Sequence, residues 1–169
     1  MIRQKILFDN KECEDIINSI KTIEEKWNFK DNRSYISENI EYNKENKWIF
    51  DKLTEYFNSV LPETKITMIN NPIHFHTYYQ GDYFKKHNDS KYNRMYGIGV
   101  LLKDDFGGGN FVFTTKDKQS TIIDKVKGNT YIFEVKIDHE IEEITSGIRQ
   151  SILWFITIEN LYIRKNKLM

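Results

Sequence analysis

Cysteine and proline are nearly absent from this chain of 169 residues, which contains one Cys and two Pro. The single cysteine, Cys13, excludes an internal disulfide framework and is typical of a reducing compartment. An excess of charge of either sign is also lacking, because 25 Lys and Arg residues balance 25 Asp and Glu residues. No net field therefore attracts nucleic acid or an anionic membrane, and we expect neither as a partner.

Long apolar runs are missing as well. No uninterrupted apolar segment approaches the length that spans a membrane, and the first five residues lead into no apolar signal segment. We therefore expect a soluble, cytoplasmic protein. The sequence also has no internal repeat, no heptad seam and no break in composition. These absences favour a monomer with one domain over residues 1–169, long enough to bury a sizeable core.

The first third of the chain has the pattern of two amphipathic helices. A short strand, Ile6–Phe8, precedes a helix that Asp9 or Asn10 can cap and that extends to about Trp27. Its apolar residues, Cys13 among them, recur at three- and four-residue steps, which predicts one buried stripe. After a polar stretch with a strand-like piece near its centre, a second helix is predicted over residues 44–60. Neither helix groups reactive side chains on one face, so we expect both to support a sheet.

From residue 64 onward the pattern changes to β. Short runs rich in β-branched and aromatic residues alternate with glycine turns. The predicted strands cover residues 65–70, 73–79, 95–102, 110–115, 120–124, 130–135, 140–145 and 149–158. Many short strands without intervening helices predict an antiparallel sandwich or barrel over residues 63–160, with residues 1–62 as its helical support.

Residues that carry chemistry are concentrated in this β half. His87 and Asp89 are two positions apart, so in an extended strand their side chains point to the same face. A later histidine, His139, which we expect in a loop, can complete a set of two imidazoles and one carboxylate. That set leaves coordination positions open and is typical of non-haem Fe(II) oxygenases. Arg149 and Ser151 share one face of the last strand.

Four motifs follow one another between about Tyr78 and Phe155. Their positions are Tyr78, Gly81, His87 and Asp89 in the first, Gly108, Gly109 and Phe113 in the second, Lys127, Gly128 and Phe133 in the third, and His139, Gly147, Arg149 and Ser151 in the last. In order and spacing this run resembles the 2-oxoglutarate/Fe(II)-dependent dioxygenases, and within them the prolyl 4-hydroxylase-like branch. The four motifs together are far more specific than any one of them.

The resemblance implies a mainly β fold, the distorted double-stranded β-helix shared with cupins (a jelly-roll-like barrel), preceded here by the two N-terminal helices. It also implies that His87, Asp89 and His139 hold Fe(II). The open positions of the iron would then take the 2-oxo acid group of 2-oxoglutarate and O₂, with ascorbate as a reductant.

The same resemblance implies how the cosubstrate is held. Arg149 would bind the distal carboxylate of 2-oxoglutarate, because a planar, permanently charged guanidinium suits a carboxylate in a barrel interior. Ser151 could give a second hydrogen bond from the same face, and Tyr78 is a further candidate donor. The alternation of Arg149, Ser151, Leu153 and Phe155 predicts that all four side chains face the barrel interior.

The implied activity is hydroxylation of a C–H bond, with release of succinate and CO₂, on a prolyl or other residue of a peptide or protein. A free amino acid or another small metabolite is an alternative substrate. A non-catalytic, cupin-like barrel that binds a metal or small ligand is an alternative of another class. The intact ligand set together with Arg149 argues against that last alternative.

The substrate side of the site matches the family less closely. Asn110 stands where many relatives have glutamate, and Phe155 where they often have tryptophan. Arg94 stands where some relatives use an arginine to hold a peptide, although a solvated position in a loop explains it as well. The polar segment 88–95 is expected to be a lid that contacts the substrate.

His74 and His76 form another pair two residues apart. Such a pair can bind a metal, but the family places its ligands later in the chain. We therefore expect these two histidines to line the rim of the barrel.

Overall fold

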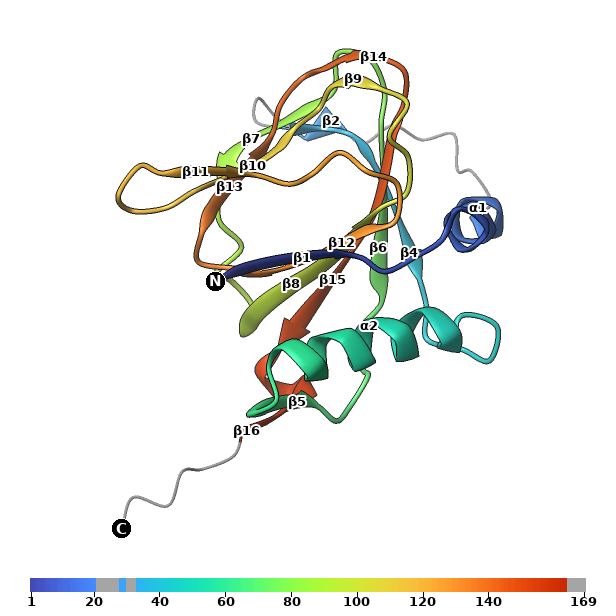
Figure 1. Ribbon diagram of the computed structural model, residues 1–169, viewed down its shortest axis with the longest axis vertical. Helices are drawn as coiled ribbons and strands as arrows, with labels where there is room; N and C mark the ends of the chain where they lie inside the picture. Colours follow the sequence, from blue (N-terminus) through green and yellow to red (C-terminus); the bar gives the residue numbers. More distant parts are fainter. Residues whose placement is uncertain (21–27, 30–32, 164–169) are drawn as a thin grey trace.

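The computed structural model describes residues 1–20, 28–29 and 33–163. Two six-stranded sheets lie one above the other, and helix α2 (Lys47–Val60) covers the outer side of the larger sheet (Figure 1). All strand pairs in these sheets are antiparallel. The prediction of a mainly β, antiparallel fold with two N-terminal helices is confirmed.

The larger sheet has the order β1 (Ile2–Ile6), β12 (Asn129–Glu134), β8 (Arg94–Leu101), β15 (Arg149–Thr157), β6 (Ile73–Tyr78) and β4 (Ile36–Ile40). The smaller sheet has the order β11 (Ser120–Ile122), β10 (Phe111–Thr114), β13 (Asp138–Ile141), β7 (Tyr83–His87), β3 (Arg33–Ser34) and β2 (Asn28–Phe29). Two ribbons complete the β structure, β9 (Gly107–Gly108) with β14 (Ile144–Ser146), and β5 (Thr64–Ile66) with β16 (Leu161–Ile163). Helix α1 spans Asn10–Ser19, and a 3₁₀ turn covers Ile158–Asn160.

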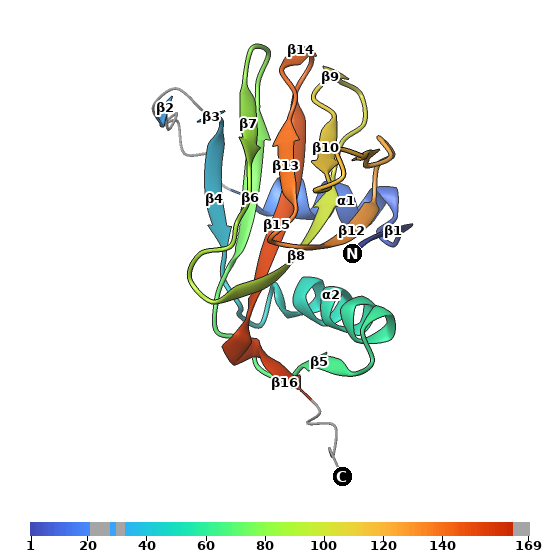
Figure 2. The same ribbon diagram turned by 90° about the vertical axis from the view of Figure 1, so that its left-hand side faces the viewer.

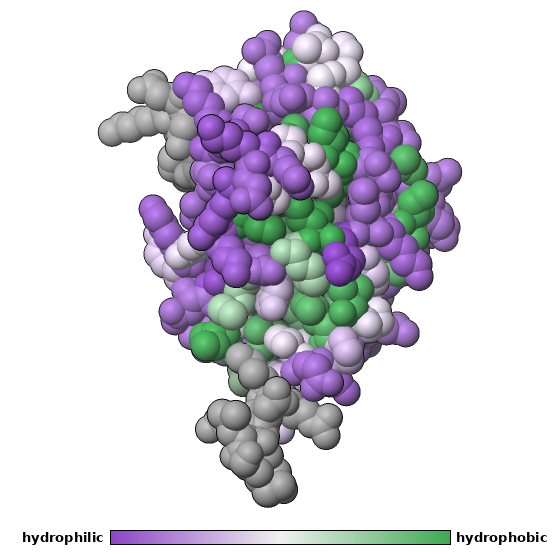
Figure 3. Space-filling model, turned by 60° about the vertical axis from the view of Figure 1, so that its left-hand side comes forward, coloured by the Kyte–Doolittle hydropathy of each residue, from purple (hydrophilic) through white to green (hydrophobic). Residues whose placement is uncertain are grey.

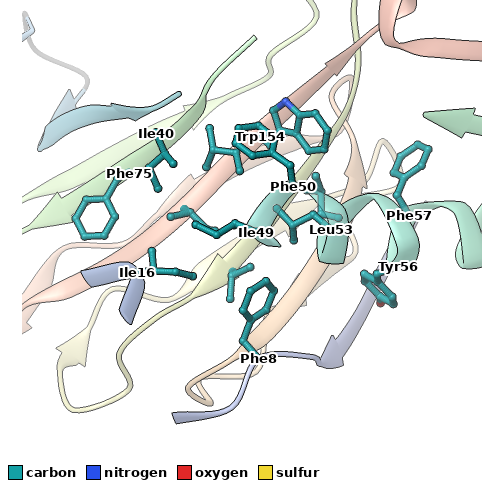
Figure 4. Packing of buried hydrophobic residues seen from close by; sticks show 14 of the residues in the cluster. Phe8, Ile16, Ile40, Ile49, Phe50, Leu53, Tyr56, Phe57, Phe75 and Trp154 are labelled. Carbon is teal, nitrogen blue, oxygen red and sulfur yellow. The ribbon is translucent and has the colours of Figure 1, made fainter. Parts of the chain in front are cut away.

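The larger sheet has an apolar cluster on each face. Toward the helices, Trp154 of β15 packs edge-on against Phe50 of α2, with ring centroids 5.2 Å apart (Figure 4). Toward the smaller sheet, Tyr131 and Phe133 of β12 join a second cluster, while Ile132 between them belongs to the first. Because successive side chains of a strand alternate between its faces, each central strand contributes to both clusters.

Helix α1 is shorter than predicted. Asp9 caps it in a reciprocal capping box with Glu12, which confirms the predicted start. The helix ends at Ser19, because Ile20 is extended and its N–H bonds to the Ile17 carbonyl. The prediction of helix beyond this point is wrong at Ile20, and residues 21–27 lie outside the described residues. Cys13 is buried on the apolar face, as predicted.

The N-terminal third also contributes strands where other structure was expected. The short strand predicted at Ile6–Phe8 instead covers Ile2–Ile6, which pairs along β12. The sequence did not indicate this strand, because most of its residues are polar and exposed. The strand lies at an edge of the sheet and is held by backbone hydrogen bonds. The strand-like piece predicted around Tyr35 and Ile36 overlaps β4, which is longer than expected and a full partner of β6. Helix α2 starts at Lys47, after a turn in which the side chain of Asn43 accepts backbone hydrogen bonds.

Most strands of the β half lie near their predicted positions, with a few corrections. The strand predicted over residues 65–70 is limited to β5, and the one over 140–145 is divided between β13 and β14. Strand β7 was not predicted, because its residues lack an apolar alternation. His139 lies on β13 and not in a loop, directly opposite His87 of β7. Figure 2 shows β7, β13 and β10 running side by side.

Neither helix in the described part of the chain has both the length and the apolar character of a membrane-spanning segment. On the face shown in Figure 3, hydrophobic residues gather near the centre and hydrophilic residues surround them.

Candidate active site

A cavity of about 270 Å³ lies between the two sheets. Strands β6, β8 and β15 of the larger sheet and strands β7, β10 and β13 of the smaller sheet contribute side chains to it. The cavity is lined by every residue that the sequence marked as a candidate: Tyr78, His87, Asp89, Arg94, His139, Arg149 and Ser151. The pairing of distant strands, and not sequence proximity, brings them together.

His87, Asp89 and His139 converge on one point of the cavity. His139 Nε2 lies 3.0 Å from Asp89 Oδ2, and His87 Nε2 lies 3.8 Å from Asp89 Oδ1. One ligand atom from each residue lies within 4.8 Å of the other two. In residues 1–20, 28–29 and 33–163 this is the one group of three such side chains close enough to share a metal ion.

Both imidazoles are oriented by backbone carbonyl groups. The Nδ1 atom of His87 lies 2.7 Å from the carbonyl oxygen of Lys85, and that of His139 lies 2.8 Å from the carbonyl oxygen of Ile137. A carbonyl oxygen only accepts, so each Nδ1 carries a proton and each Nε2 faces the cavity. Hydrogen bonds of this kind fix the tautomer of histidines that bind metals.

Asp89 is held in its charged form. Burial raises the pKa of its carboxyl, but the hydrogen bond from His139 and the interactions with His139, His87 and Arg94 outweigh burial, so this pKa lies below its ordinary value. The backbone N–H of Asp89 donates to the Val135 carbonyl, which fixes the residue just beyond the end of β7. A carboxylate that stays ionised among imidazoles is suited to a divalent cation.

Arg149 occupies a deeply buried part of the cavity wall, with only 3% of its surface exposed. Its Nη1 donates to Ser151 Oγ at 2.8 Å, and its guanidinium carbon lies 5.4 Å from the centroid of the Tyr78 ring. Its Nε has no hydrogen-bond partner within the described part of the chain. Among the described residues that line the cavity, Asp89 is the one with an acidic side chain. A buried cation in this state is costly, so Arg149 is suited to an anion that enters the cavity.

Arg94 lies at a more exposed part of the same cavity. It begins β8, so it is not in a solvated loop, and its guanidinium carbon is 3.7 Å from the centroid of the Phe155 ring. Its Nη1 is 3.8 Å from Asp89 Oδ1. Tyr92 and Asn93, just before it, both have left-handed backbone conformations, and the Asn93 carbonyl accepts a hydrogen bond from the backbone of the 3₁₀ turn.

His74 and His76 also line the cavity but do not join the triad. His74 Nδ1 lies 3.1 Å from Asn39 Oδ1, and burial lowers the pKa of His74. The side chains of Leu153 and Phe155 face the cavity as the alternation along β15 predicted, while Trp154 packs on the helix side.

Tyr131 of β12 is a cavity residue that the sequence did not single out. It lies two residues before Phe133, which belongs to the third motif, so the two side chains share a face. That alternation was the available signal, but a tyrosine in a strand more often fills a core than a site.

Comparison with known proteins assigns the family. Residues 73–157, half of the chain, match the family model of the 2OG-Fe(II) oxygenase superfamily. The chain belongs to this superfamily. The triad and Arg149 all lie within the matched segment. A search of curated proteins finds no match.

Solved structures of other oxygenases have the same fold. An oxidoreductase of the 2OG-Fe(II) oxygenase family from Burkholderia pseudomallei aligns with a TM-score of 0.75 at 15% identity, over 98% of this chain and 89% of that one. The viral collagen prolyl hydroxylase of Paramecium bursaria Chlorella virus-1, solved with 2-oxoglutarate, gives 0.66 at 20% identity, over 91% and 94%. A prolyl hydroxylase of Trichoplax adhaerens, solved with a hypoxia-inducible-factor peptide, gives 0.68 at 14%, over 95% and 84%. The fold of this oxygenase is the double-stranded β-helix.

The described residues fit the metal and cosubstrate that the family implies. Two imidazoles and a carboxylate presented to one point form the donor set of non-haem Fe(II) sites. Arg149 has an unpartnered Nε, and the one carboxylate that the described residues bring to the cavity belongs to the triad, so the site fits a cosubstrate with a carboxylate of its own.

Proposed function

We propose that this oxygenase is an Fe(II)- and 2-oxoglutarate-dependent hydroxylase that acts on a prolyl or another residue of a peptide or protein and releases succinate and CO₂. One observation carries the proposal: the His87/Asp89/His139 triad and the buried, incompletely partnered Arg149 line the same cavity. A metal-binding module without cosubstrate chemistry has no need of such an arginine.

Each residue is assigned a definite task in this proposal. His87, Asp89 and His139 hold the iron, and the carbonyl groups behind the two imidazoles keep their Nε2 atoms directed at it. Arg149 binds the distal carboxylate of 2-oxoglutarate, with Ser151 fixing the guanidinium. When bound, Fe(II) and 2-oxoglutarate would supply the electrons that reduce and so activate O₂, and the protein supplies orientation and a cavity between two sheets.

Tyr78 is assigned a supporting role in cosubstrate binding. Its buried ring stacks on Tyr35, with centroids 4.9 Å apart, and lies beside the Arg149 guanidinium. We assign substrate contacts to Arg94 and to the segment 88–95, because they lie on the more exposed side of the triad. A guanidinium stacked on Phe155 is well placed to meet a polar group of a peptide.

Support for a peptide substrate comes from the relatives. Two of the similar structures are prolyl hydroxylases by name, and one of them was solved with a peptide. The cavity itself offers aromatic rings from Tyr35, Phe155 and His74 together with Arg94, which suits an apolar ring next to polar backbone.

The first experiment measures cosubstrate turnover. The full chain is incubated with Fe(II), 2-oxoglutarate, ascorbate and O₂, and succinate is quantified for the wild type and for His87→Ala. We expect succinate from the wild type alone. Under anaerobic conditions we also expect the wild type to show a metal-to-ligand charge-transfer band with Fe(II) and 2-oxoglutarate. His74→Ala, a histidine of the same cavity outside the triad, is the matched control and should retain the band. Absence of both band and succinate in the wild type excludes the enzyme and favours a non-catalytic binding barrel.

The second experiment identifies the substrate class. Peptides that contain proline, free amino acids and small metabolites are each incubated with the active enzyme, and products are detected by the gain of one oxygen atom in mass. Peptide products that are lost in Arg94→Ala support the proposal. Oxidation of free amino acids or metabolites alone would replace the peptide substrate with the small-molecule one.

A further inference from the structure

Two glycines of β8 lie directly opposite two aromatic residues of β12. Gly97 pairs with Phe133, and Gly99 pairs with Tyr131. A Cβ atom on Gly97 would lie 2.3 Å from Cζ of the Phe133 ring, and one on Gly99 would lie 2.5 Å from Cζ of Tyr131 and 2.6 Å from its hydroxyl oxygen. Neither ring could hold its position across β8 if these residues had side chains, because such contacts lie far inside van der Waals distance.

The two rings reach different functional groups. Phe133 packs against the imidazole of His139, with ring centroids 5.1 Å apart. Tyr131, only 2% exposed, lines the cavity together with Arg149. Tyr131 and Arg149 also line a second, much smaller cavity, so these two side chains border both spaces. The sheet therefore places one glycine–aromatic pair at the metal ligand and another at the buried arginine.

The hydroxyl of Tyr131 has a proton to donate. Burial raises the pKa of Tyr131, and the charge of Arg149 and a hydrogen bond with its side chain only partly oppose this effect. The phenol is therefore neutral at physiological pH. In the bond with Arg149 the guanidinium must donate and the phenol oxygen accept, because arginine has no acceptor atom. The O–H hydrogen of Tyr131 remains available to an acceptor beside Arg149.

On the basis of the function proposed above, we propose that Tyr131, held flat across β8 by Gly99, is a further cosubstrate-binding residue. With Arg149 it forms the polar end of the cavity, and its hydroxyl adds a hydrogen bond for the distal carboxylate of 2-oxoglutarate. Tyr131 thereby favours a 2-oxo acid whose second carboxylate reaches the polar end of the cavity over one that lacks this group. The Gly97–Phe133 pair does not take part in this recognition, since it supports the metal ligand His139.

The test compares two ligands of the metal. Both 2-oxoglutarate and oxalate can chelate a metal ion, but oxalate has no distal carboxylate to reach Arg149 and Tyr131. Calorimetry on the full chain loaded with Mn(II) gives the affinity for each ligand. For Tyr131→Phe, which keeps the ring, we expect the affinity for 2-oxoglutarate to fall about 10-fold, the loss of one hydrogen bond to a charged group. The affinity for oxalate should stay within about 2-fold of the wild type, within the variation expected away from a lost contact.

Gly97→Ala and Gly99→Ala form a matched pair on one strand. Each adds a methyl group under one aromatic ring, so their effects on folding should be similar. Gly99→Ala should lower the affinity for 2-oxoglutarate relative to oxalate, because it displaces Tyr131. Gly97→Ala should instead weaken Mn(II) binding and leave the ratio of the two ligand affinities unchanged. Circular dichroism confirms that each variant is folded before its affinities are compared.

The outcomes separate this inference from the proposed function. Arg149→Met should abolish measurable 2-oxoglutarate binding and retain oxalate binding. Suppose that Arg149→Met behaves in this way, and that Tyr131→Phe changes the affinities for 2-oxoglutarate and oxalate equally or changes neither. The role of Tyr131 is then refuted, and the proposed function stands. If Arg149→Met binds 2-oxoglutarate as the wild type does, the cosubstrate site itself has been misassigned.

Discussion

Replacement of Arg149 by methionine should make the metal-free protein more stable while removing cosubstrate binding. Arg149 is 3% exposed, and across residues 1–20, 28–29 and 33–163 its Nε finds no hydrogen-bond partner and the cavity no carboxylate outside the triad. A buried donor left unsatisfied costs about 1–3 kcal/mol. Methionine has a similar length, buries without any polar requirement, and fills irregular space well.

The expected gain follows from these quantities. Arg149→Met removes the unsatisfied donor and the desolvated charge, and it forfeits the hydrogen bonds to Ser151 and Tyr131. We expect the free energy of unfolding to rise by about 1–3 kcal/mol, comparable to apolar replacement of other buried ionic groups. For a chain of this size, each kcal/mol raises Tm by about 2–4 °C, so the variant should melt about 2–12 °C above the wild type.

The assay is thermal unfolding with and without ligands. With Mn(II) present, 2-oxoglutarate at 100 times its Kd should stabilise the wild type by about 2.7 kcal/mol. Arg149→Met should gain nothing from 2-oxoglutarate beyond the metal effect. When cosubstrate is added, the melting temperatures of the wild type and of Arg149→Met should therefore converge, or their order should reverse. Such a result is a trade-off between stability and function.

A control on the same strand isolates the buried charge. Gln150→Met places the same side chain on the opposite face of β15, where we expect a change within about 0.5 kcal/mol. If metal-free Arg149→Met melts below the wild type, Arg149 is satisfied in the folded protein and the reasoning about its missing anion fails.

Three further predictions concern folding and the metal. Gly128→Ala should destabilise the fold far more than Gly81→Ala: both have left-handed φ, which costs about 1–2 kcal/mol, but only at Gly128 would a Cβ collide with a backbone carbonyl, at 1.9 Å. Equal denaturation midpoints would contradict this. Cys13, whose pKa burial raises to about 11, should not react with a thiol reagent at pH 8 until the protein is unfolded, and rapid labelling of the native protein would show that α1 opens. His139→Ala should lose the rise in Tm that Mn(II) gives the wild type, and a retained rise would place the metal elsewhere.

Helices and strands with a solvated face were predictable because their side chains repeat with a clear period. The start of α1 at the Asp9 cap and the alternation along β15 are examples. The end of α1 was not predictable, because an apolar stripe does not show at which residue the chain leaves the helical conformation. Strands β1 and β7 were misplaced or missed because polar residues dominate them and backbone pairing with β12 and β13 determines their structure.

The site could be predicted in composition but not in geometry. His87, Asp89, His139 and Arg149 could be named because the four motifs that contain or surround them resemble a known family in order and spacing. Their convergence depends on the pairing of β7 with β13 and on the stacking of the two sheets, which are contacts between residues far apart in the chain. Local periodicity contains no information about such pairings.

The sequence by itself determined the mainly β class, the triad and the buried arginine, because these depend on residue types at fixed spacings. Only the tertiary structure decided which side chains surround them. Tyr131 and Gly99 are more than thirty residues apart, and each looks ordinary in its own strand. They form a unit because β8 and β12 lie side by side in one register, so that a missing side chain on one strand makes room for a ring on the other.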